Sequence, residues 1–290
     1  MNDKVVLITG ATGGIGKAAA MALAKQGYTL VIHGRSREKT QQVCEELKSV
    51  SRNNKIEALI ADLFLLTEVK KLAEAFKKKY NRLDILINNA GGIMSREREV
   101  TREGVEKTLA INLFAPFLLM KEFSELMKLS PDARIINVSS NSHKLNAKPD
   151  PDDLQLEHGY NPLRSYGNSK LFLIWISRYY AKQLQDQGIN HVTVNTLHPG
   201  AVATNFGRKS NLGPILNTLA KWMRPLFKTP EQGADTIVYL ATSEEAGKIS
   251  GKYFVNRKPA PVSEKYVTKD TGKLVWDYCE KLVSEQVKAD

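Results

Sequence analysis

Tyr166 and Lys170 have the residue types and the spacing needed to move a proton. They lie four residues apart in the stretch RSYGNSK, directly before the apolar run LFLIWI, so in a helix both side chains would share one face. A free tyrosine has a pKa of about 10, and a nearby cation favours its phenolate. A unit charge about 5 Å away, at an effective dielectric constant of about 20, would contribute about 3 kcal/mol, or about 2 pKa units. An ordinary surface pair on a helix is the alternative.

The size and composition of the chain fit one α/β domain. Its 290 residues, 42% of them hydrophobic, can bury a sizeable core. It contains no uninterrupted apolar window of about 18 residues, so we expect no membrane span. The N-terminal MNDKVVLITG does not resemble a secretion signal. Cys44 and Cys279 match no zinc spacing and suit a reducing compartment, so the expected location is cytoplasmic.

The formal net charge of +11 comes from 42 Lys and Arg against 31 Asp and Glu. The basic residues are scattered along the chain, and no basic run is interleaved with aromatic residues. Solvated helix faces therefore explain the charge better than a nucleic-acid surface does, and we expect no nucleic-acid partner. The histidines have no common metal-binding spacing, so we predict no metal site and interpret them as turn or structural residues: His33, His143, His158, His191 and His198.

Short apolar runs alternate with longer amphipathic segments along the chain. The apolar runs are rich in Val, Ile and Leu and have no polar face, which is typical of a parallel sheet covered on both sides. The pattern predicts a single doubly wound α/β domain of Rossmann type over residues 1–290, with a mostly parallel seven-stranded sheet and helices on both faces. Strands are expected at 4–9, 29–33, 55–61, 83–88, 134–140, 191–197 and 252–255, and helices at 14–27, 36–50, 67–80, 105–128, 165–187 and 229–240.

The first predicted strand runs directly into the glycine-rich stretch TGATGGIG, residues 9–16, which opens the first predicted helix. Glycines let the backbone turn tightly and approach a pyrophosphate, and a helix N-terminus offers unpaired N–H groups. The spacing is G-x-x-x-G-x-G, but the strand–loop–helix context of a dinucleotide site is present. The predicted cofactor residues here are Gly10, Thr12, Gly13, Gly14, Ile15 and Gly16.

The second predicted strand ends in His33-Gly34-Arg35. Enzymes that prefer NAD usually place Asp or Glu at this strand end to bind the ribose 2′-hydroxyl, and the first carboxylate here is Glu38. Arg35 could instead bind a 2′-phosphate, with Ser36 as a helper. We therefore predict NADP(H) over NAD(H), against the alternative that Arg35 is an ordinary surface residue.

Polar and small residues follow the third and fourth predicted strands. Asp62 and Leu63 follow one strand, and Asn89, Ala90 and Gly91 follow the next. Open α/β sheets bind ligands at the carboxyl ends of their strands, so these residues are predicted to contact the cofactor. Asp62 could accept a hydrogen bond from an adenine amino group, and the small Ala90 and Gly91 would let the cofactor lie against the backbone.

Taken together and in order, these motifs resemble the short-chain dehydrogenase/reductase family. The resemblance spans residues 4–255 and rests on TGATGGIG, DL at 62–63, NNAG at 88–91, Asn112, INVSS at 136–140, Tyr166-x-x-x-Lys170 and HPGAVAT at 198–204. The spacing around VSSNSH, DDLQLE and YGNSKLF is most similar to the retinol-dehydrogenase-like branch. The resemblance implies hydride transfer between NADP(H) and a carbonyl/alcohol pair, with an apolar substrate such as a retinoid, a steroid or another lipophilic carbonyl.

Carried over by position, the resemblance implies a catalytic tetrad of Asn112, Ser140, Tyr166 and Lys170. Ser140 is the second residue of a Ser-Ser pair and would polarise the substrate carbonyl. Lys170 would also bind ribose hydroxyls, and Asn112 would help to hold a water that relays the proton. Ser140 and Tyr166 lie 26 residues apart, a longer gap than in many relatives. The same resemblance assigns the cofactor residues Pro199, Gly200, Val202 and Thr204.

Two segments are expected to border the substrate, at about 141–164 and 205–228. His143 and Tyr160 would flank the substrate side of the tetrad. Apolar residues in the second segment have helical spacing, which indicates either a helix packed on the core or an apolar lid. The helices at 105–128 and 165–187 are the usual association surfaces of the family, which implies a homodimer or a homotetramer. A nucleotide-binding regulatory module without turnover is the main alternative function.

Overall fold

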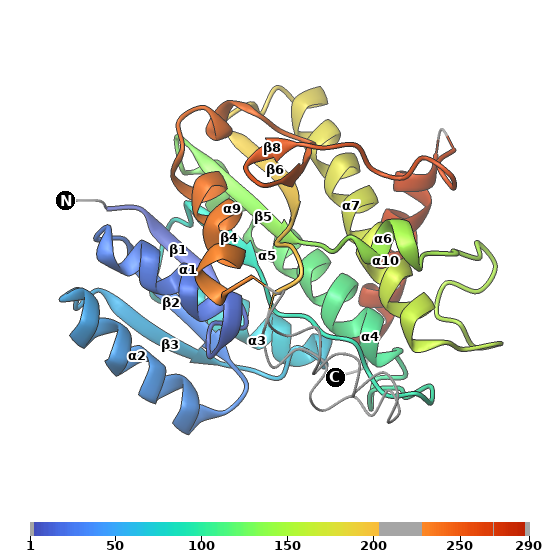
Figure 1. Cartoon of the computed structure of the whole chain (residues 1–290), viewed down its shortest axis with the longest axis horizontal. Helices are drawn as coiled ribbons and strands as arrows, with labels where there is room; N and C mark the ends of the chain where they lie inside the picture. Colours follow the sequence, from blue (N-terminus) through green and yellow to red (C-terminus); the bar gives the residue numbers. More distant parts are fainter. Residues whose placement is uncertain (1–2, 203–227, 269, 288–290) are drawn as a thin grey trace.

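Eight strands form one sheet through the middle of the molecule (Figure 1). The computed structural model describes residues 3–202, 228–268 and 270–287. The strand order is β3-β2-β1-β4-β5-β6-β7-β8, and all neighbouring strands are parallel except β7 and β8. The strands are β1 Val5–Ile8, β2 Thr29–Gly34, β3 Ile56–Ile60, β4 Ile85–Asn88, β5 Ala133–Val138, β6 Val192–His198, β7 Tyr253–Val255 and β8 Lys258–Pro259. The doubly wound prediction is confirmed, with one short antiparallel strand, β8, beyond the seven expected.

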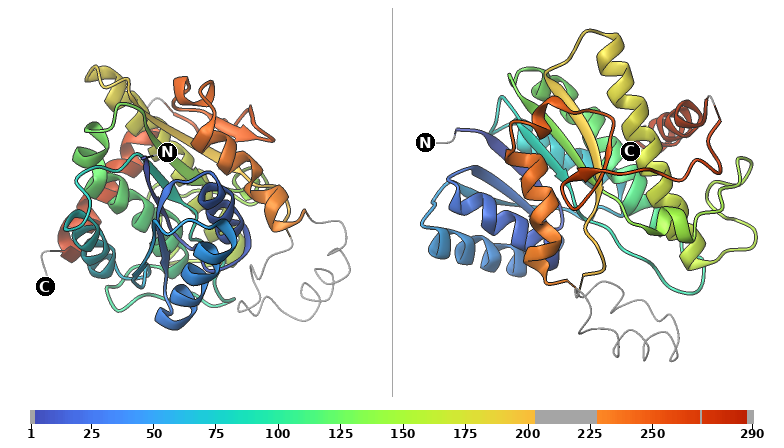
Figure 2. Two further views of the ribbon diagram at one scale, coloured as in Figure 1. Left: turned by 90° about the vertical axis from the view of Figure 1, so that its left-hand side faces the viewer. Right: turned by 45° about the horizontal axis from the view of Figure 1, so that its top comes forward.

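Helices cover both faces of the sheet because its central strands are apolar on both sides. The residues of β4 and β5 are buried throughout. One buried cluster packs α1, α2 and α9 against the sheet, and the other packs α3, α5 and α7 against the opposite face (Figure 2). The main helices are α1 Gly14–Lys25, α2 Arg37–Ser51, α3 Leu66–Lys77, α5 Ala115–Lys128, α7 Pro162–Asp186, α9 Pro230–Thr242 and α10 Thr271–Val287.

The continuous helix expected over 105–128 is wrong in its first half. Helix α4 spans only Lys107–Leu109, a π-helical turn follows at Ala110–Phe114, and α5 begins at Ala115. The side chain of Glu106 caps the start of α4 by accepting hydrogen bonds from the N–H groups of Thr108 and Leu109. Asn112 lies inside the π-helical turn, and such turns are frequent at functional sites.

Helix α10 was not expected from the sequence. It packs on α7 and α5 through Trp276, whose ring lies 4.8 Å from Phe117 and 5.2 Å from Tyr180 between centroids. Lys121 of α5 also pairs with Glu280 of α10. This helix therefore covers part of the surface through which the resemblance implies association. A homodimer or homotetramer stays a prediction. No helix among the described residues is long and apolar enough to cross a membrane.

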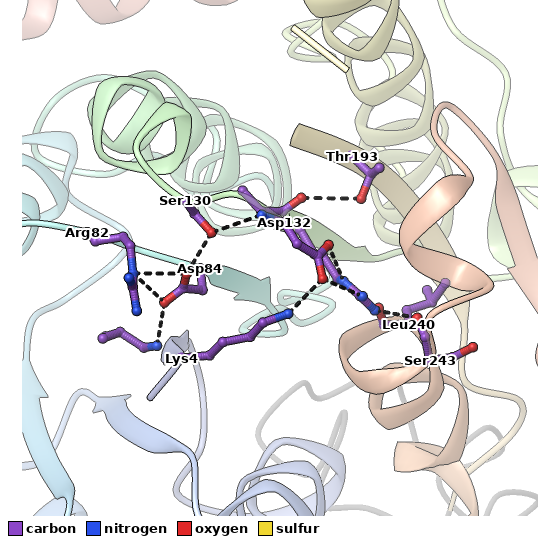
Figure 3. Close-up of polar contacts among 11 residues, drawn as sticks. Lys4, Arg82, Asp84, Ser130, Asp132, Thr193, Leu240 and Ser243 are labelled. Carbon is purple, nitrogen blue, oxygen red and sulfur yellow. Dashed lines mark hydrogen bonds and ion pairs between the residues drawn. The ribbon is translucent and has the colours of Figure 1, made fainter. Parts of the chain in front are cut away.

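A polar cluster lies at the amino ends of the strands and links the sheet to α9 (Figure 3). Arg134 donates from Nη1 to the carbonyl oxygens of Leu240 and Ser243 at 3.0 and 2.7 Å, and its Nη2 and Nε bind Asp132 at 2.8 and 3.0 Å. Lys4 Nζ also donates to Asp132, at 2.7 Å. Burial alone would raise the pKa of Asp132, but the hydrogen bonds from Arg134 and Lys4 outweigh it and hold the pKa at about 2.

Replacing Asp132 with Asn should lower the free energy of unfolding at pH 7 by about 1 kcal/mol, a value discounted for the exposure of the side chain. Because the pKa is lower in the folded state, the stabilisation is present above the usual value of 3.8 and is lost as the pH falls through about 2. Urea unfolding of the wild type and Asp132→Asn should therefore give a difference that shrinks between these two pH values.

Asp186→Asn is the matched control, because Asp186 forms an exposed ion pair with Lys182 on α7. It should leave the free energy of unfolding almost unchanged. A difference for Asp132→Asn that stayed constant from pH 4 to pH 2 would contradict the assigned pKa.

Candidate active site

The glycine-rich loop after β1 is fastened to the end of β4. Thr9 Oγ1 accepts hydrogen bonds from the N–H groups of Asn89 and Ala90, both at 3.0 Å. Asn89 Nδ2 in turn donates to the carbonyl oxygens of Thr9 at 2.9 Å and Gly10 at 3.2 Å. Strands β1 and β4 are neighbours where the order of the sheet reverses, and open α/β sheets bind ligands at such a point. The side chain of Asn89 thus positions the loop.

The glycines of this loop let its backbone pack closely at Gly10 and Gly16 and leave open space at Gly13. A Cβ on Gly10 would lie 2.8 Å from Ala90 Cα, and one on Gly16 would lie 2.5 Å from the Gly10 carbonyl oxygen. A Cβ on Gly13 would meet nothing within 4 Å. No side chain of the described residues caps the start of α1, and its first turn holds no acidic residue. The first N–H groups of α1 are therefore available to an anion, and the loop fits a dinucleotide.

His33, near the end of β2, hydrogen-bonds the glycine-rich loop. Its Nδ1 accepts from the N–H of Gly10 at 3.3 Å, and its Nε2 lies 3.1 Å from the carbonyl oxygen of Ala61. Since Nδ1 accepts a hydrogen bond, the proton belongs on Nε2, which donates to Ala61. Burial lowers the pKa of His33 to about 4, so the ring is neutral at physiological pH. The interpretation of His33 as a structural residue fits these contacts.

The residues after β2 and β3 form the adjoining part of the candidate cofactor site. Arg35 is exposed and its guanidinium lies 5.9 Å from the centroid of the Phe64 ring. Ser36 caps α2 by accepting from the N–H of Lys39 at 3.4 Å. Asp62 is half-buried and its Oδ1 accepts from the N–H of Phe64 at 3.2 Å. Leu63 is buried in the core, so only its backbone could face a ligand.

Tyr166 and Lys170 lie on α7, buried at the carboxyl end of β5. Lys170 Nζ donates to the carbonyl oxygen of Val138 at 2.9 Å and lies 5.7 Å from the centroid of the Tyr166 ring. The side chains of Tyr166 and Ser140 form a hydrogen bond. Ser139 instead donates to the carbonyl oxygen of Lys170 at 2.9 Å. Of the two serines, Ser140 therefore has the position that suits a substrate carbonyl.

Asn112 reaches the same place from the π-helical turn. Its Oδ1 accepts from the N–H of Gly92 at 3.0 Å, and its Nδ2 donates to the Gly92 carbonyl oxygen at 2.8 Å. A Cβ on Gly91 would lie 2.6 Å from Asn112 Oδ1 and 3.1 Å from Lys170 Nζ. The absence of a side chain at Gly91 thus lets these two polar groups lie close together. The four residues of the predicted tetrad are gathered at one edge of the sheet.

Burial dominates the ionisation of the Tyr166 and Lys170 pair. Burial raises the pKa of Tyr166 to about 12, and the hydrogen bond with Ser140 lowers it by less. Burial also lowers the pKa of Lys170 to about 7. The lowered tyrosine pKa expected from the sequence is therefore wrong for the protein's own groups. Desolvation disfavours the charged form of both residues, and near pH 7 Lys170 carries only part of a charge.

His143 contacts the backbone of Ser140. It is buried, its Nδ1 lies 2.6 Å from the carbonyl oxygen of Ser140, and its ring meets that of Tyr253 edge-on at 4.9 Å. Its Nε2 has no hydrogen-bond partner among the described residues. These contacts let His143 hold the backbone of Ser140, and the expected contact with substrate stays a prediction.

The stretch after β6 borders the same site. Gly200 has a φ of 92°, and a Cβ there would lie 2.9 Å from Lys228 Cδ. Val202 pairs with Lys228 in an isolated bridge and packs near Gly233 with Ile15. Pro199 is half-buried beside them. Thr204 and nearly all of the predicted segment at 205–228 lie outside the described residues, as does the choice between a packed helix and an apolar lid.

Three residues outside the predicted set also contribute to the site. Thr9 and His33 hold the glycine-rich loop, and buried Glu106 joins α4 to α7. Thr9 opens the stretch TGATGGIG and His33 ends the second predicted strand, but the sequence does not show their partners 23 to 80 residues away, nor the Ser165 partner of Glu106, 59 residues away. No cluster of three His, Cys, Asp or Glu that could hold a metal ion occurs in the part of the chain that the structure describes.

Comparison with known proteins gives a consistent result. Residues 4–214 match the family model described as short chain dehydrogenase. Human polyprenol dehydrogenase is 36% identical over 261 residues, which cover 88% of this chain and 78% of that protein. Human retinol dehydrogenase 13 is 34% identical over 294 residues, covering 97% and 84%. The Pseudomonas aeruginosa RhlG/NADP active-site complex has a TM-score of 0.67 and 26% identity, covering 87% of this chain and 94% of that chain. The resemblance predicted from the motifs is confirmed.

Replacing Lys170 with Met tests the ionisation of this site. A pKa that falls from 10.5 to about 7 on folding means that the folded state binds fewer protons between these values. The free-energy cost of burying Lys170 is therefore absent above 10.5, grows as the pH falls, and is complete below about 7. The free energy of unfolding of the wild type, relative to Lys170→Met, should rise by about 1 kcal/mol per pH unit in this range. Urea unfolding at pH 7, 8 and 9 measures it.

Lys182→Met is the control on the same helix, because the side chain of Lys182 is 71% exposed. Its difference from the wild type should be nearly flat over the same pH range. An equally flat result for Lys170→Met would mean that Lys170 is not desolvated.

Proposed function

Because this chain belongs to the short-chain dehydrogenase family, we propose that it transfers a hydride between NADP(H) and a carbonyl/alcohol pair, with Tyr166 as the acid/base. Membership of the family carries the coarser statement, an oxidoreductase with a nicotinamide cofactor. One fold serves many reactions, so the finer proposal has to come from the site. The observation that carries it is the meeting of Asn112, Ser140, Tyr166 and Lys170 beside a loop that fits a dinucleotide.

The proposed chemistry divides among the four residues as follows. The bound cofactor supplies or accepts the hydride. Tyr166, with a pKa of about 12, is a protonated phenol at neutral pH, the form needed to protonate a carbonyl oxygen during reduction. Ser140 bonds the same phenol and would stabilise the negative charge that develops on that oxygen.

Lys170 and Asn112 would complete the proton path. Lys170 Nζ lies 5.7 Å from the centroid of the Tyr166 ring and has a pKa of about 7, so it can gain and lose a proton near neutral pH. Asn112 would help to hold a water that passes the proton between Lys170 and solvent. The approach of Asn112 Oδ1 and Lys170 Nζ to the same face of Gly91 supports this assignment.

The preference for NADP(H) is proposed from the end of β2. A side chain at Gly34 would collide with Thr12 Cγ2 and Thr40 Oγ1, so this position has no room for a carboxylate that would bind a ribose 2′-hydroxyl. The next residue, Arg35, is exposed, and its guanidinium lies over the Phe64 ring. That position suits recognition of a 2′-phosphate, with Ser36 beside it. The other predicted cofactor residues are proposed from their positions on the glycine-rich loop and after the strands.

The substrate is proposed to be apolar, such as a retinoid, a steroid or another lipophilic carbonyl. The support is the similarity to human retinol dehydrogenase 13 and human polyprenol dehydrogenase. The segment at 141–164 lies next to the tetrad in the chain and would border the substrate. A panel of carbonyl compounds from short aldehydes to retinal and steroids, followed by NADPH consumption, tests the proposal. Turnover of short aldehydes alone would reject the proposal of an apolar substrate. Turnover of none of these compounds would reject the proposed carbonyl-reductase activity.

Replacing Tyr166 with Phe should lower kcat by about 100- to 10,000-fold, because it removes the proton donor and leaves the ring in place. The affinity for NADPH should stay within about twofold, measured by the quenching of protein fluorescence. Tyr180→Phe is the control, since Tyr180 is a buried tyrosine on the same helix that donates to Ser124 Oγ at 2.9 Å. It should keep turnover, whereas near-normal turnover by Tyr166→Phe would remove Tyr166 from the mechanism.

Replacing Arg35 with Ala should weaken NADPH binding by about 10- to 100-fold and leave NADH binding nearly unchanged, because only NADPH carries the 2′-phosphate. Arg37→Ala is the matched control, an exposed arginine at the start of α2. The dissociation constants of both cofactors should be measured for each variant. Equal losses for NADPH and NADH in Arg35→Ala would reject the assignment.

A further inference from the structure

Glu106 is a buried carboxylate that the proposed chemistry does not use. Its exposed fraction is 0%, and its two oxygens accept four hydrogen bonds. Oε1 accepts from the Thr108 N–H at 2.9 Å and the Tyr160 hydroxyl at 3.4 Å. Oε2 accepts from the Leu109 N–H at 2.8 Å and the Ser165 hydroxyl at 3.0 Å. None of the ion pairs among the described residues includes Glu106, so hydrogen bonds and the start of a helix offset the cost of burying it.

The hydrogen bonds from the N–H groups of Thr108 and Leu109 fix the start of the turn that carries Asn112. Thr108 and Leu109 lie in α4, which continues directly into the π-helical turn at Ala110–Phe114. The carbonyl oxygen of Glu106 also accepts from the N–H of Ala110 at 2.8 Å. Glu106 therefore sets where this turn begins, and with it the position from which Asn112 reaches Gly92.

The hydrogen bond from Ser165 joins the carboxylate to the other half of the site. Ser165 is buried and directly precedes Tyr166 in the first turn of α7. Asn161 caps the same turn by accepting from the N–H groups of Leu163 and Arg164, both at 3.0 Å. Asn161 caps the N-terminus of α7, and Glu106 holds the same turn through Ser165, the residue before Tyr166.

The third connection is to the long segment between Ser140 and Tyr166. Tyr160 donates to Glu106 Oε1, and Gln155 Oε1 accepts from the Glu106 N–H at 2.8 Å. Arg98 Nε donates to the Gln155 carbonyl oxygen at 3.2 Å, which ties the same segment to the stretch after β4. Residues 146–161 form no regular element, so side-chain bonds such as these help to order them.

We propose that Glu106 is a positioning residue that sets Asn112 and Tyr166 relative to each other and orders residues 146–161 beside the substrate. The inference rests on the proposed function. An amide could not replace the carboxylate, because its NH₂ group would meet donors where Glu106 has an acceptor. Two of the three connections make separable contributions: Ser165 acts on Tyr166, and Tyr160 acts on residues 146–161.

Steady-state kinetics with the best carbonyl substrate separates these contributions. Ser165→Ala should lower kcat by about 10-fold with little change in KM, because it frees the turn that carries Tyr166. Tyr160→Phe should raise the KM by about 5- to 10-fold with little change in kcat, because it loosens the substrate segment. Glu106→Gln should lower kcat and raise the KM. The double variant Glu106→Gln with Tyr160→Phe should raise the KM no further than Glu106→Gln alone. NADPH affinity should stay within about twofold throughout.

Ser177→Ala is the matched control, a buried serine of α7 that donates to the Leu173 carbonyl oxygen at 2.6 Å and lies away from Glu106. It should lower stability and leave kcat and KM unchanged. A purely structural role for Glu106 predicts the same pattern for Glu106→Gln, and that pattern would overturn the proposal. Should Glu106→Gln not fold, Ser165→Ala and Tyr160→Phe carry the test.

Hydrogen exchange provides a test that does not need turnover. Glu106→Gln should speed exchange at least 10-fold in residues 146–161 and in the first turns of α7, while exchange in α1 stays unchanged. Unchanged exchange in both segments would overturn the proposal whatever the kinetics show. If the wild type turned over no carbonyl compound, the proposed function would fail, and exchange alone would decide the role of Glu106 in positioning Tyr166 and Asn112.

Discussion

The arrangement of the site depends on the buried amine of Lys170. Removing an amine from water disfavours its charge, and the lowered pKa of Lys170 expresses that cost. A hydrogen bond to the Val138 carbonyl oxygen at the end of β5 and the nearby Tyr166 ring are its contacts. Helix α7 can hold it there because one face of the helix packs on the sheet and the other is covered by α10. The rigidity of these layers keeps Tyr166, Ser140 and Lys170 together.

The cofactor side of the site depends on backbone contacts. The loop after β1 lies close to the end of β4 because Gly10 and Gly16 have no side chains and because Thr9 and Asn89 exchange hydrogen bonds. His33 adds a neutral ring between the ends of β1, β2 and β3. Each of these groups faces protein atoms, so their task is to hold the loop in shape. The shape in turn leaves the N–H groups at the start of α1 open to an anion.

The substrate side is organised by side chains that come from distant parts of the sequence. Glu106 collects hydrogen bonds from α4, α7 and the segment before α7. Tyr278 of α10 also bonds Gln155 in that segment, which itself accepts from Glu106. Helix α10, the segment before α7 and the first turn of α7 that leads to Tyr166 thus belong to one connected set of contacts.

The sequence by itself determined the seven parallel strands and the motif residues, because apolar runs and glycine spacing are local properties of the chain. It predicted that Tyr166 and Lys170 share a helix face and that Asn112 and Ser140 join them. Only the tertiary structure decided the direction of the pKa values, since burial depends on the layers packed around α7. The π-helical turn, the covering helix α10 and the role of Glu106 were likewise invisible, because each depends on contacts between residues far apart in the chain.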